Sequence, residues 1–152
     1  FSNLIVSRTF SKAYGLAGCR AGFIIANKSI ARRLYKFRPM YEINSISVLI
    51  LKEILRNNTI LKKYIQETKK GKEYLIKNLN RLGFNHHKSY ANLLLVNFKN
   101  QNLKTKVWNF LKQKNILVTE EPSIPGGKSF LRFGLGPVKY MKLVVKIIKK
   151  FK

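Results

Sequence analysis

The stretch SRTFSKAYGLAGCR, residues 7–20, places hydroxyl side chains, a lysine and glycines between two apolar runs. The flanking segments, residues 3–6 (NLIV) and 22–26 (GFIIA), are short and rich in residues that favour β-structure. They predict two adjacent, buried strands. We expect the segment between them to form a structured loop with one helical turn, which carries Lys12 and, eight residues later, Arg20.

Helical periodicity dominates the next part of the chain. Residues 29–37 predict a short helix with Ser29 as its N-cap, and Pro39 prevents its continuation. Apolar spacing predicts a helix over residues 45–57 and a longer one from residue 60 to Gly83, although a glycine at position 71 inside it costs about 1 kcal/mol relative to alanine. The remaining predicted elements are a strand (92–98), a helix (103–115), two strands (116–120 and 129–135) and a closing helix (138–151). The fold class is therefore α/β, with a domain boundary within the long helix.

Charge is the most unusual feature of the composition. The 152 residues contain 31 lysines and arginines against six acidic residues, all glutamate, which gives a formal net charge of +25. Such a charge attracts nucleic acid or anionic membranes. However, the basic residues are spread along the whole chain and alternate with apolar residues at helical spacing, which is typical of solvated helix faces. A basic nucleic-acid-binding module stays open as an alternative, but we expect no specific nucleic-acid partner.

Cysteine use and hydropathy indicate where the protein is located. A single cysteine, Cys19, excludes an intramolecular disulfide and is most simply a small buried apolar residue in a reducing compartment. No apolar run reaches the roughly 18 residues that span a bilayer, and residues 1–10 do not resemble a secretion signal. We therefore expect a cytoplasmic protein without a membrane partner. Because the chain starts at Phe1 on a strand-like run, we also expect a preceding segment.

The opening stretch contains the residue types that bind a phosphorylated aldehyde cofactor. A lysine forms a Schiff base with the aldehyde, and the phosphate requires hydroxyl and guanidinium donors. Lys12, Thr9, Ser11 and Arg20 supply this set, and arginine can donate two parallel hydrogen bonds to phosphate oxygens. From these residues alone, a solvated Lys12 is the default interpretation in so lysine-rich a chain.

Four ordered segments resemble one family. Residues 7–23 (SRTFSKAYGLAGCRAGF) resemble the lysine motif of class I/II aminotransferases that use pyridoxal 5'-phosphate, within the histidinol-phosphate aminotransferase-like branch. Residues 37–51, 89–98 (SYANLLLVNF) and 130–136 (FLRFGLG) resemble later segments of the same enzymes. The resemblance implies the C-terminal part of a fold type I PLP-dependent transferase.

This resemblance implies a division of the chain and a state of assembly. Residues 1–57 would be the end of the large, cofactor-binding domain, residues 58–82 an interdomain helix, and residues 83–152 a small α+β domain. The same family resemblance implies a homodimer with active sites near its interface.

The resemblance also implies roles for individual residues. Lys12 would bond to the cofactor and then move the proton between the substrate Cα and the cofactor. Thr9, Ser11 and Arg20 would hold the cofactor phosphate. Arg132 would pair with the substrate carboxylate and Asn92 would bind substrate, whereas a structural arginine at a strand edge and a strand-capping asparagine are the alternatives. Tyr14, within the lysine motif, can equally be a packing residue.

The implied reaction moves an amino group between an amino acid, or a phosphorylated amine such as histidinol phosphate, and a 2-oxo acid. A threonine-phosphate decarboxylase-like enzyme is the alternative within the same resemblance. These enzymes place an aspartate against the cofactor's pyridine nitrogen, and this sequence has no aspartate. We therefore expect a C-terminal fragment that is inactive alone.

Three further motifs do not support a site. PGGKS (125–129) lacks the earlier glycine of a phosphate-binding loop, because Pro122 stands there, and is followed by a predicted strand. Adjacent His86 and His87 would face opposite ways on a strand, so we expect no metal site. The spacing Thr9-x-x-Lys12 resembles an acyl-enzyme motif whose companion motifs are absent.

Overall fold

A computed structural model describes residues 1–120 and 125–152. The chain divides into two compact units, residues 1–63 and 64–152, which are described separately below. No helix within the described residues is both long and apolar enough to cross a membrane.

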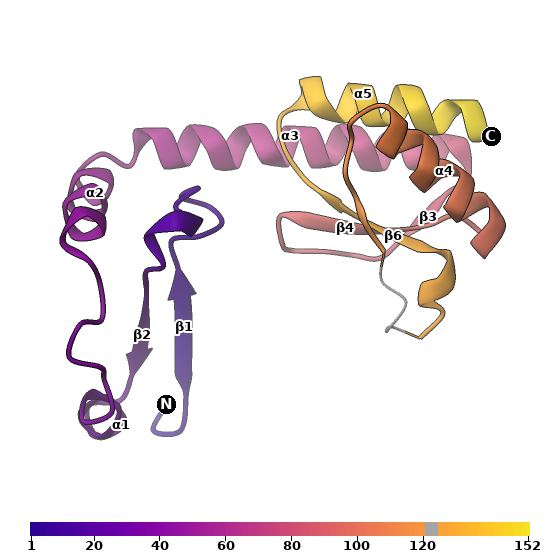
Figure 1. The fold of residues 1–152 in the computed structure, drawn as a ribbon. Helices are drawn as coiled ribbons and strands as arrows, with labels where there is room; N and C mark the ends of the chain where they lie inside the picture. The colour runs from indigo at the N-terminus through magenta and orange to yellow at the C-terminus, as the bar shows by residue number, and fades with distance from the viewer. Residues whose placement is uncertain (121–124) are drawn as a thin grey trace. The chain divides into compact units, whose positions relative to one another are not determined.

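The first unit begins with a pair of antiparallel strands, β1 (Ile5–Thr9) and β2 (Gly22–Ala26), shown side by side in Figure 1. Their register pairs Ile5 with Ala26 and Thr9 with Gly22, so residues 10–21 form the connection at one end. The predicted adjacency of the strands is confirmed. Their predicted burial is wrong, because this sheet has only two strands in the described chain and side chains such as Ile25, 58% exposed, face solvent.

The first unit also contains η1 (Ala17–Cys19), α1 (Lys28–Tyr35), α2 (Ser45–Arg56) and the beginning of a longer helix. The predicted N-cap of α1, Ser29, is wrong. The Asn27 side chain accepts a hydrogen bond from the Ser29 N–H at 3.0 Å, so the N-cap lies two residues earlier than predicted and the helix begins at Lys28. Asn44 caps α2 in the same way, accepting from the Ser47 N–H at 2.8 Å.

A small apolar cluster joins the loop of the first unit to α2. Its buried members are Phe10, Cys19, Ala21 and Leu51, with Tyr14 and Leu16 packed against them. The prediction that Cys19 is a buried small residue is confirmed. This cluster fixes the loop between β1 and β2 from its inner side.

The long helix α3 (Thr59–Leu82) leads into the second unit, to which its residues from Tyr64 onward belong. That unit contains an antiparallel sheet with the strand order β3-β4-β6-β5. The strands are β3 (Asn85–His86), β4 (Leu93–Asn97), β5 (Thr119–Glu120) and β6 (Phe130–Gly134). Strand β6 is therefore central, flanked by β4 and β5.

Three helices, α3, α4 (Gln101–Gln113) and α5 (Val138–Ile148), cover one face of this sheet (Figure 1). The short helices η2 (Gly127–Ser129) and η3 (Lys149–Phe151) precede β6 and follow α5. Fully buried side chains from all of these layers form one core, including Leu75, Leu94, Val107, Leu131 and Ile148. Because side chains alternate along a strand, Leu95 and Arg132 lie on the opposite face.

Two elements differ from prediction at the edges of the sheet. β3 was not predicted, and β5 covers two residues instead of the predicted 116–120. Residues 125–129 form a turn and η2, and β6 follows them. The strand predicted after PGGKS is therefore confirmed. Pro122 lies outside the described residues. His87 stacks on Phe130 with ring centroids 5.0 Å apart.

Candidate functional site

The loop between β1 and β2 is held by a series of backbone hydrogen bonds. The Phe10 N–H donates to the Ala21 carbonyl at 3.2 Å, which closes the loop at its base. The Leu16 N–H donates back to the Phe10 carbonyl at 3.0 Å, and the Cys19 N–H donates to Leu16 at 3.1 Å. With Phe10 buried beneath it, the loop has a defined path from Thr9 to Arg20.

Two hydroxyl groups lie together where β1 ends. The Thr9 Oγ1 hydroxyl donates to Ser11 Oγ at 2.9 Å and accepts from the Ser11 N–H at 3.1 Å. This local turn fixes both hydroxyls on one side of the loop. Since Thr9 is exposed and Ser11 half-buried, both are available to a ligand.

Arg20 lies at the other end of the loop, immediately after η1. Its backbone has φ 49° and ψ 35°, in the left-handed region that non-glycine residues adopt infrequently. The Arg20 N–H donates to the Ala17 carbonyl at 3.3 Å, and its Nη1 donates to the same carbonyl at 3.4 Å. One oxygen thus holds both the backbone and the guanidinium of Arg20.

The two ends of the loop line one open hollow of about 630 Å³. Thr9, Ser11 and Arg20 all border it, together with Arg8 on β1 and Glu42 in the segment before α2. Glu42 forms an ion pair with Arg38, with 3.8 Å between Oε2 and Nη1. Apart from Glu42, the polar side chains that border the hollow are hydrogen-bond donors, a set that favours an anionic ligand.

Lys12 lies in the turn between the two hydroxyls and η1. The Gly15 N–H donates to the Lys12 carbonyl at 3.0 Å, and Gly15 has a positive φ of 69°, which closes the turn tightly. Lys12 is exposed, and it is not among the residues that border the hollow. The structure thus brings Thr9, Ser11 and Arg20 together and leaves Lys12 beside them on the adjoining turn.

The other two candidate residues lie in the second unit, one on β6 and one immediately before the neighbouring strand β4. Arg132, half-buried on β6, is paired in register with Leu95 of β4 and Thr119 of β5. Asn92 is exposed immediately before β4, and its carbonyl accepts from the Leu135 N–H at 2.9 Å. This bond agrees with a strand-capping role for the Asn92 backbone. In the first unit, Tyr14 packs on Phe10 with ring centroids 4.9 Å apart.

Two residues of the hollow were not predicted from the sequence. Arg8 lies within the opening stretch, but no feature of the sequence distinguished it from the many other basic residues. Glu42 reaches the hollow because the segment after α1 runs back past β1 and β2, a path that local sequence does not determine. Within the described residues no group of three or more histidine, cysteine or glutamate side chains could hold a metal ion.

Comparison with known proteins identifies the family of this chain. The model of the family "Aminotransferase class I and II" matches residues 2–148. The histidinol-phosphate aminotransferase of Thermoanaerobacter pseudethanolicus is 38% identical over 133 residues, which are 87% of this chain and 37% of that enzyme. The chain therefore spans well under half the length of this relative.

Solved structures give the same result for the fold. The histidinol-phosphate aminotransferase of Sinorhizobium meliloti, in complex with pyridoxal-5'-phosphate, matches with a TM-score of 0.81 at 22% identity, over 99% of this chain and 42% of that one. The L-threonine-O-3-phosphate decarboxylase of Porphyromonas gingivalis matches with a TM-score of 0.77 at 27% identity, over 99% of this chain and 47% of that one. The predicted fold is confirmed as part of the fold type I PLP-dependent transferase fold. With a family model that covers nearly its whole length, the chain belongs to the class I and II aminotransferases.

Proposed function

We propose that these residues form part of a PLP-dependent aminotransferase in which Lys12 is the catalytic lysine and Thr9, Ser11 and Arg20 hold the cofactor phosphate. The observation that carries the proposal is the shared hollow, which these three phosphate-binding candidates border beside the Lys12 turn. In this proposal residues 1–57 end the large domain, residues 58–82 are the interdomain helix and residues 83–152 form the small domain. The enzyme is a cytoplasmic homodimer.

The residues around the hollow fit a phosphate monoester. Phosphate oxygens accept hydrogen bonds, and the hollow offers the Ser11 hydroxyl and the guanidinium groups of Arg8 and Arg20. The Thr9 hydroxyl becomes a further donor when it exchanges its bond to Ser11 for one to the phosphate. The carboxylate of Glu42, which would repel phosphate, is paired with Arg38. The 3.4 Å bond from Arg20 Nη1 to the Ala17 carbonyl uses one of the five N–H donors of the guanidinium. The other donors can bind phosphate oxygens, which makes Arg20 the main anchor of the phosphate in this proposal.

Lys12 performs proton transfer in this proposal. PLP, when bound, supplies an aldehyde that bonds to amines and a ring that accepts electrons from the substrate Cα. Lys12 would hold the cofactor in the resting enzyme, and its released amine would act as the base that moves the proton between the substrate Cα and the cofactor. The tight turn at Gly15 keeps the lysine backbone in place during this exchange.

Arg132 and Asn92 are assigned to the substrate. The backbone of Arg132 is held on an interior strand of the sheet, and a planar guanidinium pairs with a carboxylate through two parallel hydrogen bonds. Asn92 lies at the start of the adjacent strand, where its amide would bind substrate. We propose that the amino donor is an amino acid or a phosphorylated amine such as histidinol phosphate, and that the acceptor is a 2-oxo acid.

A threonine-phosphate decarboxylase is the second candidate, favoured by the decarboxylase relative at 27% identity. Product analysis with the full-length protein separates the two reactions. We expect histidinol phosphate and 2-oxoglutarate to give glutamate, with no carbon dioxide from threonine phosphate. Release of carbon dioxide without glutamate formation would instead identify the decarboxylase, and neither product from the PLP-loaded protein would refute both candidates.

A further inference from the structure

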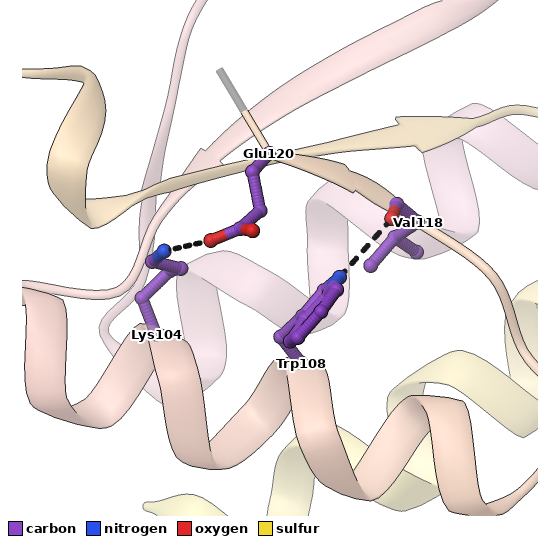
Figure 2. Close-up of polar contacts among 4 residues, drawn as sticks. All are labelled: Lys104, Trp108, Val118 and Glu120. Atoms are coloured by element: carbon purple, nitrogen blue, oxygen red, sulfur yellow. Dashed lines mark hydrogen bonds and ion pairs between the residues drawn. The ribbon is translucent and has the colours of Figure 1, made fainter. Parts of the chain in front are cut away.

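A buried charge on α4 is paired with the edge strand of the second unit. Lys104 is buried, with its side chain 8% exposed, and its Nζ donates to Oε1 of Glu120 on β5 (Figure 2). A buried lysine is costly unless its charge is paired. The ion pair therefore holds Lys104 and Glu120 together. The Glu120 side chain is 39% exposed, so only one partner of the pair is buried.

A second bond joins the same helix to the same strand segment. The Trp108 Nε1–H donates to the Val118 carbonyl at 3.3 Å. Lys104 and Trp108 are four residues apart, about 6 Å along a helix. Val118 and Glu120 are two residues apart, about 6.6 Å along a strand. Because these spacings match, α4 holds the segment 118–120 at two points.

These two bonds determine how β5 lies beside Arg132. β5 has two residues at the edge of the sheet, and such a short edge strand frays readily without other contacts. Val118 and Glu120 face α4, so Thr119 between them faces the opposite side of the sheet. Thr119 is the register partner of Arg132, and side chains of such pairs are neighbours on one face.

We propose that Lys104 and Trp108 are positioning residues for Arg132. By fixing segment 118–120 from the core side, they fix Thr119 against Arg132 on the other side and so limit the directions that the guanidinium adopts. This inference rests on the proposed role of Arg132 in binding the substrate carboxylate. Neither Lys104 nor Trp108 touches substrate.

The test is steady-state kinetics of the full-length, PLP-loaded protein with the 2-oxo acid 2-oxoglutarate as the varied substrate. Lys104→Met removes the charge, and Trp108→Phe removes the N–H donor while it keeps an aromatic ring, although a smaller one. We expect each to raise KM for 2-oxoglutarate roughly tenfold, because small displacements of a positioning group are costly, with kcat and the cofactor absorption spectrum nearly unchanged. Lys104→Arg, which restores the positive charge, should recover most of the lost affinity.

Two controls distinguish positioning from general destabilisation. Val107→Ala truncates a fully buried side chain of the same helix and leaves both bonds to segment 118–120 in place, so it should lower the melting temperature while KM stays unchanged. If Val107→Ala raises KM as much as Lys104→Met, the effect is structural and the inference is overturned. If Lys104→Met does not fold, Trp108→Phe tests the same inference through the second bond.

A parallel Arg132→Lys variant separates this inference from the proposed function. If KM rises in Arg132→Lys but not in Lys104→Met or Trp108→Phe, the role of Arg132 stands and the positioning inference is wrong. If Arg132→Lys leaves KM unchanged, the proposed role of Arg132 fails, and the inference fails with it.

Discussion

Gly71 of α3 lies directly against the carbonyl oxygen of Gly136, so closely that a Cβ at position 71 would overlap that oxygen. The same Cβ would lie 3.2 Å from the carbonyl carbon of Pro137. The helix therefore meets the segment before α5 backbone to backbone. This explains why a helix-weakening residue stands in the middle of α3.

We predict that Gly71→Ala destabilises the protein despite the higher helix propensity of alanine. Because the overlap is with a backbone oxygen, we expect the upper end of the overpacking range, about 3 kcal/mol. Alanine gains about 1 kcal/mol over glycine, so the expected net loss is about 2 kcal/mol in the free energy of unfolding. Urea denaturation of the full-length protein measures it. The exposed neighbour Glu73→Ala is the control and should stay within about 0.5 kcal/mol. An unchanged Gly71→Ala variant would mean that this close approach does not exist.

Thr9→Val should weaken cofactor binding. The substitution keeps the shape of the side chain but removes the hydroxyl that bonds Ser11 and faces the hollow. A lost hydrogen bond to a charged group corresponds to about 1.5–3 kcal/mol, or on the order of 10- to 100-fold in the dissociation constant of PLP. A spectroscopic titration with PLP measures this constant. Thr9→Ser retains the hydroxyl and should bind like the wild type; equal weakening in both variants would argue against a role for the hydroxyl.

Arg20 and Arg132 should give opposite kinetic effects. Arg20→Ala removes the proposed phosphate anchor and should lower PLP affinity, while KM for the 2-oxo acid at saturating PLP changes little. Arg132→Ala removes the proposed carboxylate partner and should raise that KM by roughly 10- to 100-fold without loss of PLP. Steady-state kinetics at several PLP concentrations resolve the two effects. If the effects are exchanged, the two arginines have been assigned to the wrong ligands.

Nucleic-acid binding is expected to be weak and non-specific despite the charge of +25. Stacking on bases needs exposed aromatic rings near basic residues. The chain exposes several such rings, Tyr35, Phe37 and Tyr90 among them, but they are spread over separate segments of the two units. A fluorescent oligonucleotide should bind at low salt and be released at about 0.15 M salt, as counterion release requires. Tight binding at that salt concentration would favour the nucleic-acid-binding module.

Periodic segments were predictable because their structure is determined locally. The apolar spacing of residues 45–57 and 60–83 predicted α2 and α3 to within a residue or two, and GFIIA predicted β2 with its observed bounds. The edge strands were not predictable in the same way. β3 exists only because Asn85 and His86 pair with β4, and β5 is limited to the two residues that pair with β6.

The candidate site was predictable in its residue types and only partly in its geometry. Thr9, Ser11 and Arg20 share a hollow because β1 and β2 pair in register and bring the two ends of the loop together. Arg8 and Glu42 join them through packing and the path of the chain after α1, which no short motif encodes. Lys12 does not border the hollow. It lies on the adjoining turn, which is closed by the hydrogen bond from the Gly15 N–H to the Lys12 carbonyl.

The central claim is that Lys12 is the lysine that bonds to PLP. The most direct measurement is borohydride reduction of the full-length protein with PLP, followed by peptide mass spectrometry, with Lys12→Ala and the exposed Lys28→Ala treated in parallel. We predict one modified peptide, containing Lys12, in the wild type and in Lys28→Ala, and no specific modification in Lys12→Ala. Stoichiometric labelling of another lysine, or an unchanged absorption band in Lys12→Ala, would contradict the assignment.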